Sequence, residues 1–381
     1  MPILKKIFLL ISLLIYASSY LQEYKTIING KELIYKSYKL IREDSQLDLA
    51  KIESTDFEYV NILVVDGAKL TINQGSSVEK NIPESTLRNL LQEGQNNFYE
   101  KDEYKYGLTS NIVAIGKNTK VIIKGSTISV DSPFSNAIMA FNGAEIEISN
   151  TTVLTKYKYS KGLVVFNEAS VEIKEKSNFT TIGDFSPCLE INKDFGKIEG
   201  ENVFLYSRGI ESPLLNNKGN GQLHIFTGNG KAENSQIMVV QGTNKVLLHN
   251  CDFTCYLNET NLYNEGGIVL FNTDFENDFT EIDLDSCNLK IEKKDNKTTP
   301  MFSCYDIEGT IILTNTQTTF NTYIMIAYQI ENSNFATKIN LDINKTGFKG
   351  KIETKGDAKI YLKSEPNLLS EVVFVGNINV Q

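Results

Sequence analysis

Apolar and polar residues alternate over short stretches of this chain, as in Glu145-Ile146-Glu147-Ile148-Ser149. A period of two residues predicts half-buried β-strands, because successive side chains of a strand point to opposite faces. The inward apolar pairs recur from Val121 onward at steps of 25, 25, 27, 25, 23, 36 and 29 residues, which indicates a structural repeat. The pairs are Leu70/Ile72, Val121/Ile123, Ile146/Ile148, Val171/Ile173, Ile198/Gly200, Leu223/Ile225, Val246/Leu248, Ile282/Leu284 and Ile311/Leu313.

A second set of apolar pairs lies about eight residues before most members of the first set. Turn-forming residues such as Asp66-Gly67 and Asn142-Gly143 separate the two sets, so each unit predicts a strand, a tight turn and another strand. The second set is Ile62/Val64, Val113/Ile115, Ile138/Ala140, Leu163/Val165, Met238/Val240, Ile268/Leu270, Phe302/Cys304 and Met325/Ala327.

One such unit cannot bury its inner face alone, but stacked units share a continuous core. A variable segment often supplies a third strand, such as Thr127-Ile128-Ser129-Val130. Three short strands in each repeat are typical of a right-handed parallel β-helix. We therefore expect an all-β solenoid of about ten coils, which at a strand spacing near 4.8 Å makes a rod about 50 Å long.

The period breaks at residues 82–106, where Leu87, Leu90 and Leu91 at helical spacing follow Ser85, a candidate N-cap residue. We expect a short helix and a loop that protrude from the rod. Residues 20–60 are predicted to cap the N-terminal end, because an open coil exposes unpaired backbone edges. The parallel β-helix is predicted over residues 61–365, interrupted by this insertion, and a C-terminal cap strand is predicted over residues 366–381.

Residues 1–19 have the features of a secretory signal peptide: Lys5 and Lys6, an apolar run over 7–16, and small residues at Ala17 and Ser19. A transmembrane helix needs about 20 apolar residues, twice the length of this run. We expect cleavage after Ser19, no membrane span in the mature chain, and a secreted, extracellular or cell-surface location. An uncleaved signal anchor is the alternative.

The formal net charge is −9 and the chain has only three arginines. This balance argues against nucleic acid and against an anionic membrane surface as partners. Hydrophobic residues make up 41% of the chain, which is ample for a core and excludes a disordered polymer. We expect a monomer.

A secreted chain of such coils resembles the pectate-lyase-like right-handed parallel β-helix superfamily. Segments such as Ser186-Pro187-Cys188 and His249-Asn250-Cys251 are similar to those of uncharacterised secreted, adhesin-like β-helix proteins of microbes. The resemblance covers roughly residues 60–365. It implies surface attachment or contact with an extracellular polysaccharide or cell-surface glycan, without a defined reaction.

Polygalacturonase-like hydrolases of this superfamily carry an Asn-Thr-Asp motif, which Asn272-Thr273-Asp274 matches. Their Asp-Asp pair, Gly-His-Gly motif and Arg-x-Lys motif are absent from this sequence. Because a general acid and a base must face one another across the scissile bond, a lone tripeptide supplies no catalytic pair. We expect a non-catalytic protein with no catalytic residues, and a diverged uronate-polymer lyase or hydrolase is the alternative.

No cofactor or metal site is expected, although one acidic string offers the oxygen ligands that calcium prefers. Within it, Asp283 and Asp285 alternate with Ile282 and Leu284, which is typical of a solvated strand face. Weak calcium binding by the string is the alternative. The two histidines, His224 and His249, point outward at non-equivalent positions and are not expected to share a site. The string is Asp274, Glu276, Asp278, Glu281, Asp283 and Asp285.

Five cysteines are an odd number for an oxidising compartment. Cys251 and Cys287 each follow an inward pair by three residues. Stacked coils would hold their Cα atoms about 4.8 Å apart, within the range for a disulfide. A Cys251–Cys287 disulfide and a pair of buried free thiols are both compatible with this position.

The chain has no Trp, but Tyr99, Tyr104 and Tyr106 gather in the predicted insertion. These rings would either stack against a glycan or pack the insertion onto the rod. Five Asn-x-Ser/Thr sequons, at Asn150, Asn178, Asn258, Asn296 and Asn344, predict glycosylation in a eukaryotic secretory pathway. The sequence therefore predicts a secreted, adhesin-like or glycan-contacting β-helix protein.

Overall fold

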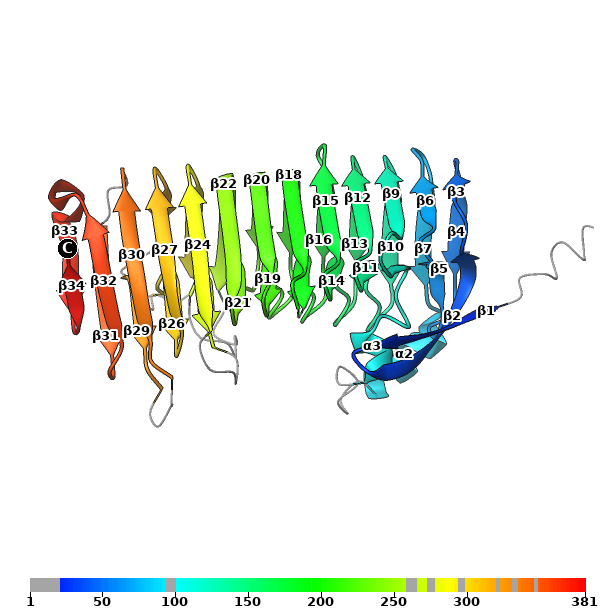
Figure 1. Cartoon of the computed structure of the whole chain (residues 1–381), viewed down its shortest axis with the longest axis horizontal. Helices are drawn as coiled ribbons and strands as arrows, with labels where there is room; N and C mark the ends of the chain where they lie inside the picture. Colours follow the sequence, from blue (N-terminus) through cyan, green and yellow to red (C-terminus); the bar gives the residue numbers. More distant parts are fainter. Residues whose placement is uncertain are drawn as a thin grey trace, which may run out of the picture.

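Short strands of the chain stack in parallel along one axis and form a rod (Figure 1). The computed structural model describes residues 21–93, 101–192, 194–257, 266–272, 278–293, 299–319, 323–330, 335–345 and 349–381. Strands make up 60% of the structure, which is a parallel β-solenoid of about 11 turns. The expected all-β solenoid is confirmed.

The first wall of the solenoid is a 14-stranded sheet, here called sheet A. All of its strands are parallel except β1, which pairs antiparallel with β2. Its strands are β1 (Gln22–Ile28), β2 (Lys31–Ile41), β5 (Val60–Val64), β8 (Ile112–Ile115), β11 (Ile138–Phe141), β14 (Leu163–Phe166), β17 (Leu189–Asn192), β19 (Leu215–Lys218), β21 (Met238–Gln241), β23 (Ile268–Phe271), β26 (Phe302–Tyr305), β29 (Tyr323–Tyr328), β31 (Lys349–Lys355) and β33 (Glu371–Val375).

The other walls belong to a 20-stranded sheet, sheet B, which bends at a corner. At this corner most coils have a residue with positive φ, such as Asn150 at 46° or Asn315 at 48°, a conformation that Asn tolerates well. Its strands are β3 (Ser45–Leu47), β4 (Lys51–Ser54), β6 (Lys69–Ile72), β7 (Ser77–Asn81), β9 (Lys120–Lys124), β10 (Thr127–Asp131), β12 (Glu145–Ser149), β13 (Thr152–Thr155), β15 (Ser170–Lys174), β16 (Asn178–Thr181), β18 (Lys197–Ser207), β20 (Gln222–Ala232), β22 (Asn244–Leu257), β24 (Phe279–Asp285), β25 (Asn288–Lys293), β27 (Glu308–Thr314), β28 (Gln317–Thr319), β30 (Lys338–Asn344), β32 (Lys359–Ser364) and β34 (Ile378–Val380).

The inward pairs of sheet B stack in the predicted register. Ile146 pairs with Val121 on one side and Val171 on the other, and Ile198 pairs with Leu223. The column continues through Val246, Ile282 and Ile311. These side chains belong to one apolar core that runs along the rod, so the repeat assigned from the sequence is the repeat of the structure.

The predicted pair Val113/Ile115 is out of register. Ile62 pairs with Ile112, and Val64 pairs with Ala114, so Val113 and Ile115 face outward. They are nevertheless buried, because the β1–β2 hairpin and the segment after β7 cover them. The strand is apolar on both faces, and alternation alone could not show which face is the inner one.

The insertion leaves the rod after β7 and contains α2 (Glu84–Glu93) and α3 (Asp102–Lys105). It lies beside the N-terminal coils together with the hairpin (Figure 1). Tyr35 of the hairpin donates a hydrogen bond of 2.5 Å to the carbonyl oxygen of Tyr106, which joins the two covering segments. The cover is a small second core against the outer face of sheet A.

Residues 31–54 of the predicted N-terminal cap already form a coil, since β2, β3 and β4 pair in parallel with β5, β6 and β7. Among the strands that the structure describes, only β1 lacks a parallel partner. At the other end, the 3-10 helix η2 (Pro366–Leu369) precedes β33 and β34, which extend both sheets by one more layer.

Candidate functional site

The outer face of sheet A changes character between β14 and β17. In the column of outward residues, Met139 and Val164 are buried beneath the cover, and the next positions are Glu190 and Asn216. The neighbouring column of outward residues, two positions further along each strand, also changes from apolar to polar. Phe141 and Phe166 of this column belong to the covered cluster, and Lys218, two coils later, is half-buried. A polar stretch therefore follows directly after the cover, before the column returns to the buried Val239 and Val269.

A groove of about 600 Å³ lies at this transition. Its lining combines amide, charged and aromatic side chains that come from successive coils and from α3. Three lysines and two glutamates give it a net positive formal charge within an acidic protein. The polar and aromatic lining residues are Lys105, Lys161, Lys218, Glu190, Glu211, Asn136, Asn192, Asn216, Gln236, Gln241, Tyr104, Tyr159, Phe185 and Phe271.

The floor of the groove is an ion pair that is almost completely buried. The Lys161 ammonium contacts Glu190 Oε1, and the side chain of Glu190 is 1% exposed. Asn216 Nδ2 donates to Glu190 Oε2 at 2.6 Å, and Asn192 Nδ2 donates to Oε1 at 3.2 Å. Both carboxylate oxygens are thus hydrogen-bonded, as a buried charge requires.

Electrostatics keep this carboxylate ionised. Burial alone would raise the pKa of Glu190, but the charges of Lys161 and Lys218 and the hydrogen bonds from Lys161 and Asn216 lower it below its ordinary value. The pKa of Tyr104 is raised well above 10 by burial and by the nearby Glu190 charge. Its ring lies 5.3 Å from the Lys161 ammonium, a cation–π distance.

An aromatic stack forms one flank of the groove. Phe134, Tyr159 and Phe185 occupy the same turn in successive coils, and the next coil has Glu211 there. All four have positive φ, between 53° and 58°, which is unusual for bulky residues. The rings support each other: Phe134 and Tyr159 are stacked at 5.1 Å, and Tyr159 and Phe185 at 4.8 Å.

A buried serine follows each of these turn residues. Ser135 N–H donates to Ser160 Oγ, Ser160 N–H to Ser186 Oγ, and Ser186 N–H to Ser212 Oγ, at 3.3, 2.9 and 2.9 Å. The ladder satisfies backbone donors that the turns would otherwise bury unpaired. The serines recur at steps of 25, 26 and 26 residues, so the sequence did contain a signal for this flank that the strand analysis missed.

The tyrosines predicted to stack on a glycan lie in the insertion. Tyr104 and Tyr106 are 6% and 8% exposed. Tyr104 packs edge-on against Phe134 and Tyr159, and Tyr106 packs against Phe166. In this geometry the two rings pack the insertion onto the rod, and Tyr104 also borders the groove. Tyr99 lies outside the described residues.

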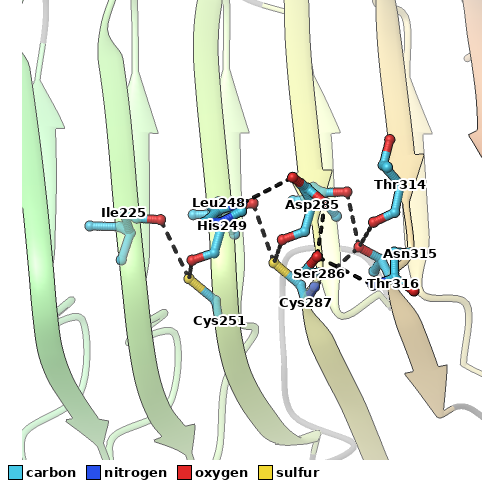
Figure 2. A network of polar contacts seen from close by, with 11 residues as sticks. Ile225, Leu248, His249, Cys251, Asp285, Ser286, Cys287, Thr314, Asn315 and Thr316 are labelled. Carbon is cyan, nitrogen blue, oxygen red and sulfur yellow. Dashed lines mark hydrogen bonds and ion pairs between the residues drawn. The ribbon is translucent and has the colours of Figure 1, made fainter.

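Cys251 and Cys287 occupy the corner of sheet B in adjacent coils (Figure 2). Both are buried free thiols: Cys251 Sγ donates to Ile225 O at 3.6 Å, and Cys287 Sγ donates to Leu248 O at 3.3 Å. Thr316 holds the next corner position, and its hydroxyl accepts a hydrogen bond from Cys287 N–H at 3.3 Å. The disulfide between the two cysteines stays a prediction.

The histidines lie on the outer face of sheet B at non-equivalent positions, since His224 pairs with Leu247 and His249 with Phe226. His249 Nδ1 is 3.0 Å from Asp285 Oδ2, a contact between adjacent coils that the sequence analysis did not foresee. His224 lies 3.6 Å from Glu199, and burial lowers its pKa despite that charge.

The acidic string is only partly described, because Asp274 and Glu276 lie outside the described residues, as does Thr273 of the Asn-Thr-Asp motif. Asp283 and Asp285 face outward on β24, as expected for a strand face. Burial raises the pKa of Asp283, and the charge of Asp285 acts in the same direction. Among the residues that the structure describes, no group of three or more His, Cys, Asp or Glu side chains could hold a metal ion.

Three of the five predicted glycosylation sites, Asn150, Asn178 and Asn344, are exposed. Asn258 and Asn296 lie outside the described residues.

Fold and groove together define this chain as a parallel β-solenoid with a polar lateral groove, an architecture consistent with the parallel β-helix superfamily. No family model matches its sequence, and no curated protein matches it. Over the described ranges, the structure contains no helix of the length and apolar character needed to cross a membrane.

Proposed function

We propose that this protein is a secreted, adhesin-like solenoid that binds an extracellular saccharide in the groove on sheet A. The observation that carries the proposal is the replacement of a covered apolar face by an open groove of amide, charged and aromatic side chains. Amides donate and accept hydrogen bonds at once, as sugar hydroxyls do. Binding sites commonly combine an apolar wall with a few fixed polar groups.

The groove is also rigid in the way that a binding site needs to be. Its floor is tied by the hydrogen bonds of Glu190, and its flank by the aromatic stack and the serine ladder. A preorganised site loses less conformational entropy when the ligand binds. The resemblance of the sequence to secreted β-helix proteins supports the same class of ligand.

The properties of Glu190 at the floor of the groove favour binding of a saccharide over its cleavage. A glycosidase needs a carboxylic acid whose pKa is raised so that it can protonate the leaving group. The pKa of Glu190 is lowered instead, and both of its oxygens already accept hydrogen bonds. Glu190 is therefore unsuited to act as a general acid.

The test is a glycan array with the purified chain, followed by titration of any ligand that binds. Lys218→Ala and Gln241→Ala remove half-buried side chains that line the groove, and each is expected to weaken binding about tenfold or more, roughly 1.4 kcal/mol. Lys290→Ala is the matched control, because Lys290 pairs with Glu292 on β25 of sheet B. Absence of any glycan ligand, or equal weakening by all three variants, would overturn the proposal. Breakdown of a uronate polymer that Glu190→Gln abolishes would favour the enzymatic alternative.

A further inference from the structure

One row of side chains on the outer face of sheet A crosses the groove. Asn192, Lys218, Gln241 and Phe271 occupy the same position in the successive strands β17, β19, β21 and β23. All four line the groove and are half-buried, and the next residue of the row, Tyr305, is only 9% exposed. Because neighbouring strands lie about 4.8 Å apart, the accessible part of the row covers about 14 Å. The groove is therefore suited to a short ligand that lies along the rod.

Two side chains of this row have polar groups that the protein leaves unused. Within the part of the chain that the structure describes, neither the Lys218 ammonium nor the Gln241 carboxamide has a hydrogen-bond or ion-pair contact. The charge of Lys218 acts on Glu190, but the oxygens of that carboxylate are already occupied by Lys161 and Asn216. A cation and an adjacent amide thus lie side by side in the groove without a bound counter-charge of their own.

We propose that the ligand of the groove is a short acidic saccharide, and that its carboxylate or sulfate group binds to Lys218. The inference rests on the proposed function and specifies its ligand. Gln241 Nε2 donates a second hydrogen bond to the anionic group, since the two residues are neighbours on adjacent strands. A sugar ring beside the anionic group then reaches Phe271 in the next coil, where the aromatic side chain supplies apolar surface.

The half-buried position of Lys218 makes the groove selective between acidic and neutral ligands. A neutral saccharide would remove the ammonium from water without supplying an opposite charge, which costs free energy. An anionic group offsets this loss through a charge-assisted hydrogen bond. The other charges permit its approach, because the lining has three lysines against two glutamates and Lys161 neutralises Glu190. One side chain therefore favours the acidic ligand and disfavours its neutral counterpart.

The test is an array of neutral oligosaccharides of one to six units beside their uronate-, sialate- and sulfate-bearing counterparts, probed with the purified full chain. Acidic members should bind, and titration calorimetry should find the strongest of them bound about tenfold or more tightly than its neutral parent. Members longer than four units should bind no more tightly than shorter ones. The three acidic sets distinguish which anionic group the groove takes.

Substitutions of Lys218 connect this preference to the proposed contact. Lys218→Met should lower the affinity for the acidic ligand about tenfold without weakening the binding of the neutral parent, whereas Lys218→Arg keeps the charge and should keep the preference. Lys290→Met is the matched control, because it removes one lysine charge from β25 of sheet B and should keep the preference as well.

The outcomes separate this inference from the proposed function. Equal affinity of the wild type for an acidic saccharide and its neutral parent would overturn the inference and leave the proposed function standing. An unchanged preference in Lys218→Met, or its loss in Lys290→Met, would do the same, because the charge of Lys218 would then have no specific part in it. Failure of every member of the array to bind would overturn both.

Discussion

Tyr159 and Phe185 stack face to face on successive coils, with ring centroids 4.8 Å apart and an interplanar angle of 7°. Both residues have a left-handed backbone conformation, with φ of 58° at Tyr159 and 56° at Phe185. That conformation costs a bulky residue roughly 1–2 kcal/mol, so the stacking and the serine hydrogen bonds must offset it at each coil. The groove flank is thus held by cooperation between neighbouring coils.

Phe134 is the buried start of this stack. Phe134→Ala should lower the free energy of unfolding by about 3–5 kcal/mol, because it removes a fully buried ring and exposes a face of Tyr159. Phe195→Ala is the control: Phe195 also has positive φ but is 66% exposed, and its loss should change stability by less than about 0.5 kcal/mol. Urea unfolding followed by circular dichroism measures both, and similar values for the two variants would contradict the role of the stack.

Lys80 is fully buried, and its ammonium donates to the carbonyl oxygens of Phe57, Tyr59 and Thr109 at 3.0, 2.6 and 2.7 Å. Burial lowers the pKa of Lys80 to about 7, against the opposing field of Asp56. Between that value and the ordinary lysine pKa of about 10.5, the unfolded chain binds more protons than the folded one. Stability should therefore rise with pH across this window, by up to about 1.4 kcal/mol per pH unit, and be insensitive to this group below it.

Urea unfolding at pH 7, 8 and 9 measures that slope, and Lys80→Met should remove this part of it. The variant should also be less stable at every pH, by about 3 kcal/mol or more, because three buried carbonyls lose their donor. An identical pH slope in the wild type and in Lys80→Met would show that Lys80 does not titrate in this range.

Cys251 and Cys287 hold a corner position that Ser126, Thr151 and Ser177 hold in earlier coils. Ser126 Oγ donates there to the carbonyls of Asn73 and Lys124 at 3.1 and 2.9 Å. In the reduced protein, Cys251→Ser should therefore change the free energy of unfolding by less than about 1 kcal/mol. Cys304→Ser should cost about 1–3 kcal/mol, because Cys304 is part of the apolar core and the hydroxyl would be buried there. Equal costs in thermal unfolding would refute the distinction.

In an oxidising medium we expect the same two thiols to form a disulfide. Thiol labelling under denaturing conditions should then find fewer than the five thiols of the reduced chain, and Cys287→Ser should leave Cys251 free to react. The closed loop should raise the free energy of unfolding by about 3–4 kcal/mol relative to the reduced protein. Labelling of all five thiols after oxidation would exclude the bond.

The sequence predicted the solenoid because each coil repeats the same inward pair. The register from Val121 to Ile311 could be assigned from alternation alone. Val113 was assigned to the inner face, although it faces outward. Its strand is apolar on both faces, because the β1–β2 hairpin covers the outer one. When a segment distant in the sequence covers the outer face of a strand, the alternation of apolar and polar residues in that strand is lost and no longer shows which face is the inner one.

The groove was harder to predict for a related reason. Glu190 and Asn216 are neighbours on adjacent strands of sheet A, but a whole repeat separates them in the sequence. Neither residue belongs to a recognisable motif. Of the tyrosines singled out in the insertion, Tyr104 and Tyr106 are buried, and composition alone could not show this, because an aromatic cluster has the same composition whether it packs inward or binds a ligand. Only the repeated serine pointed to the flank.

The cover on sheet A has a consequence for how the length of the rod can be used. Since each coil contacts only its neighbours, coils can be gained or lost in the C-terminal half without disturbing the hairpin and insertion at the other end. Every added coil would lengthen sheet A by one strand beyond the cover, so the length of the rod could be adjusted by duplicating a single repeat. The covered end would remain a fixed starting point from which that length is counted.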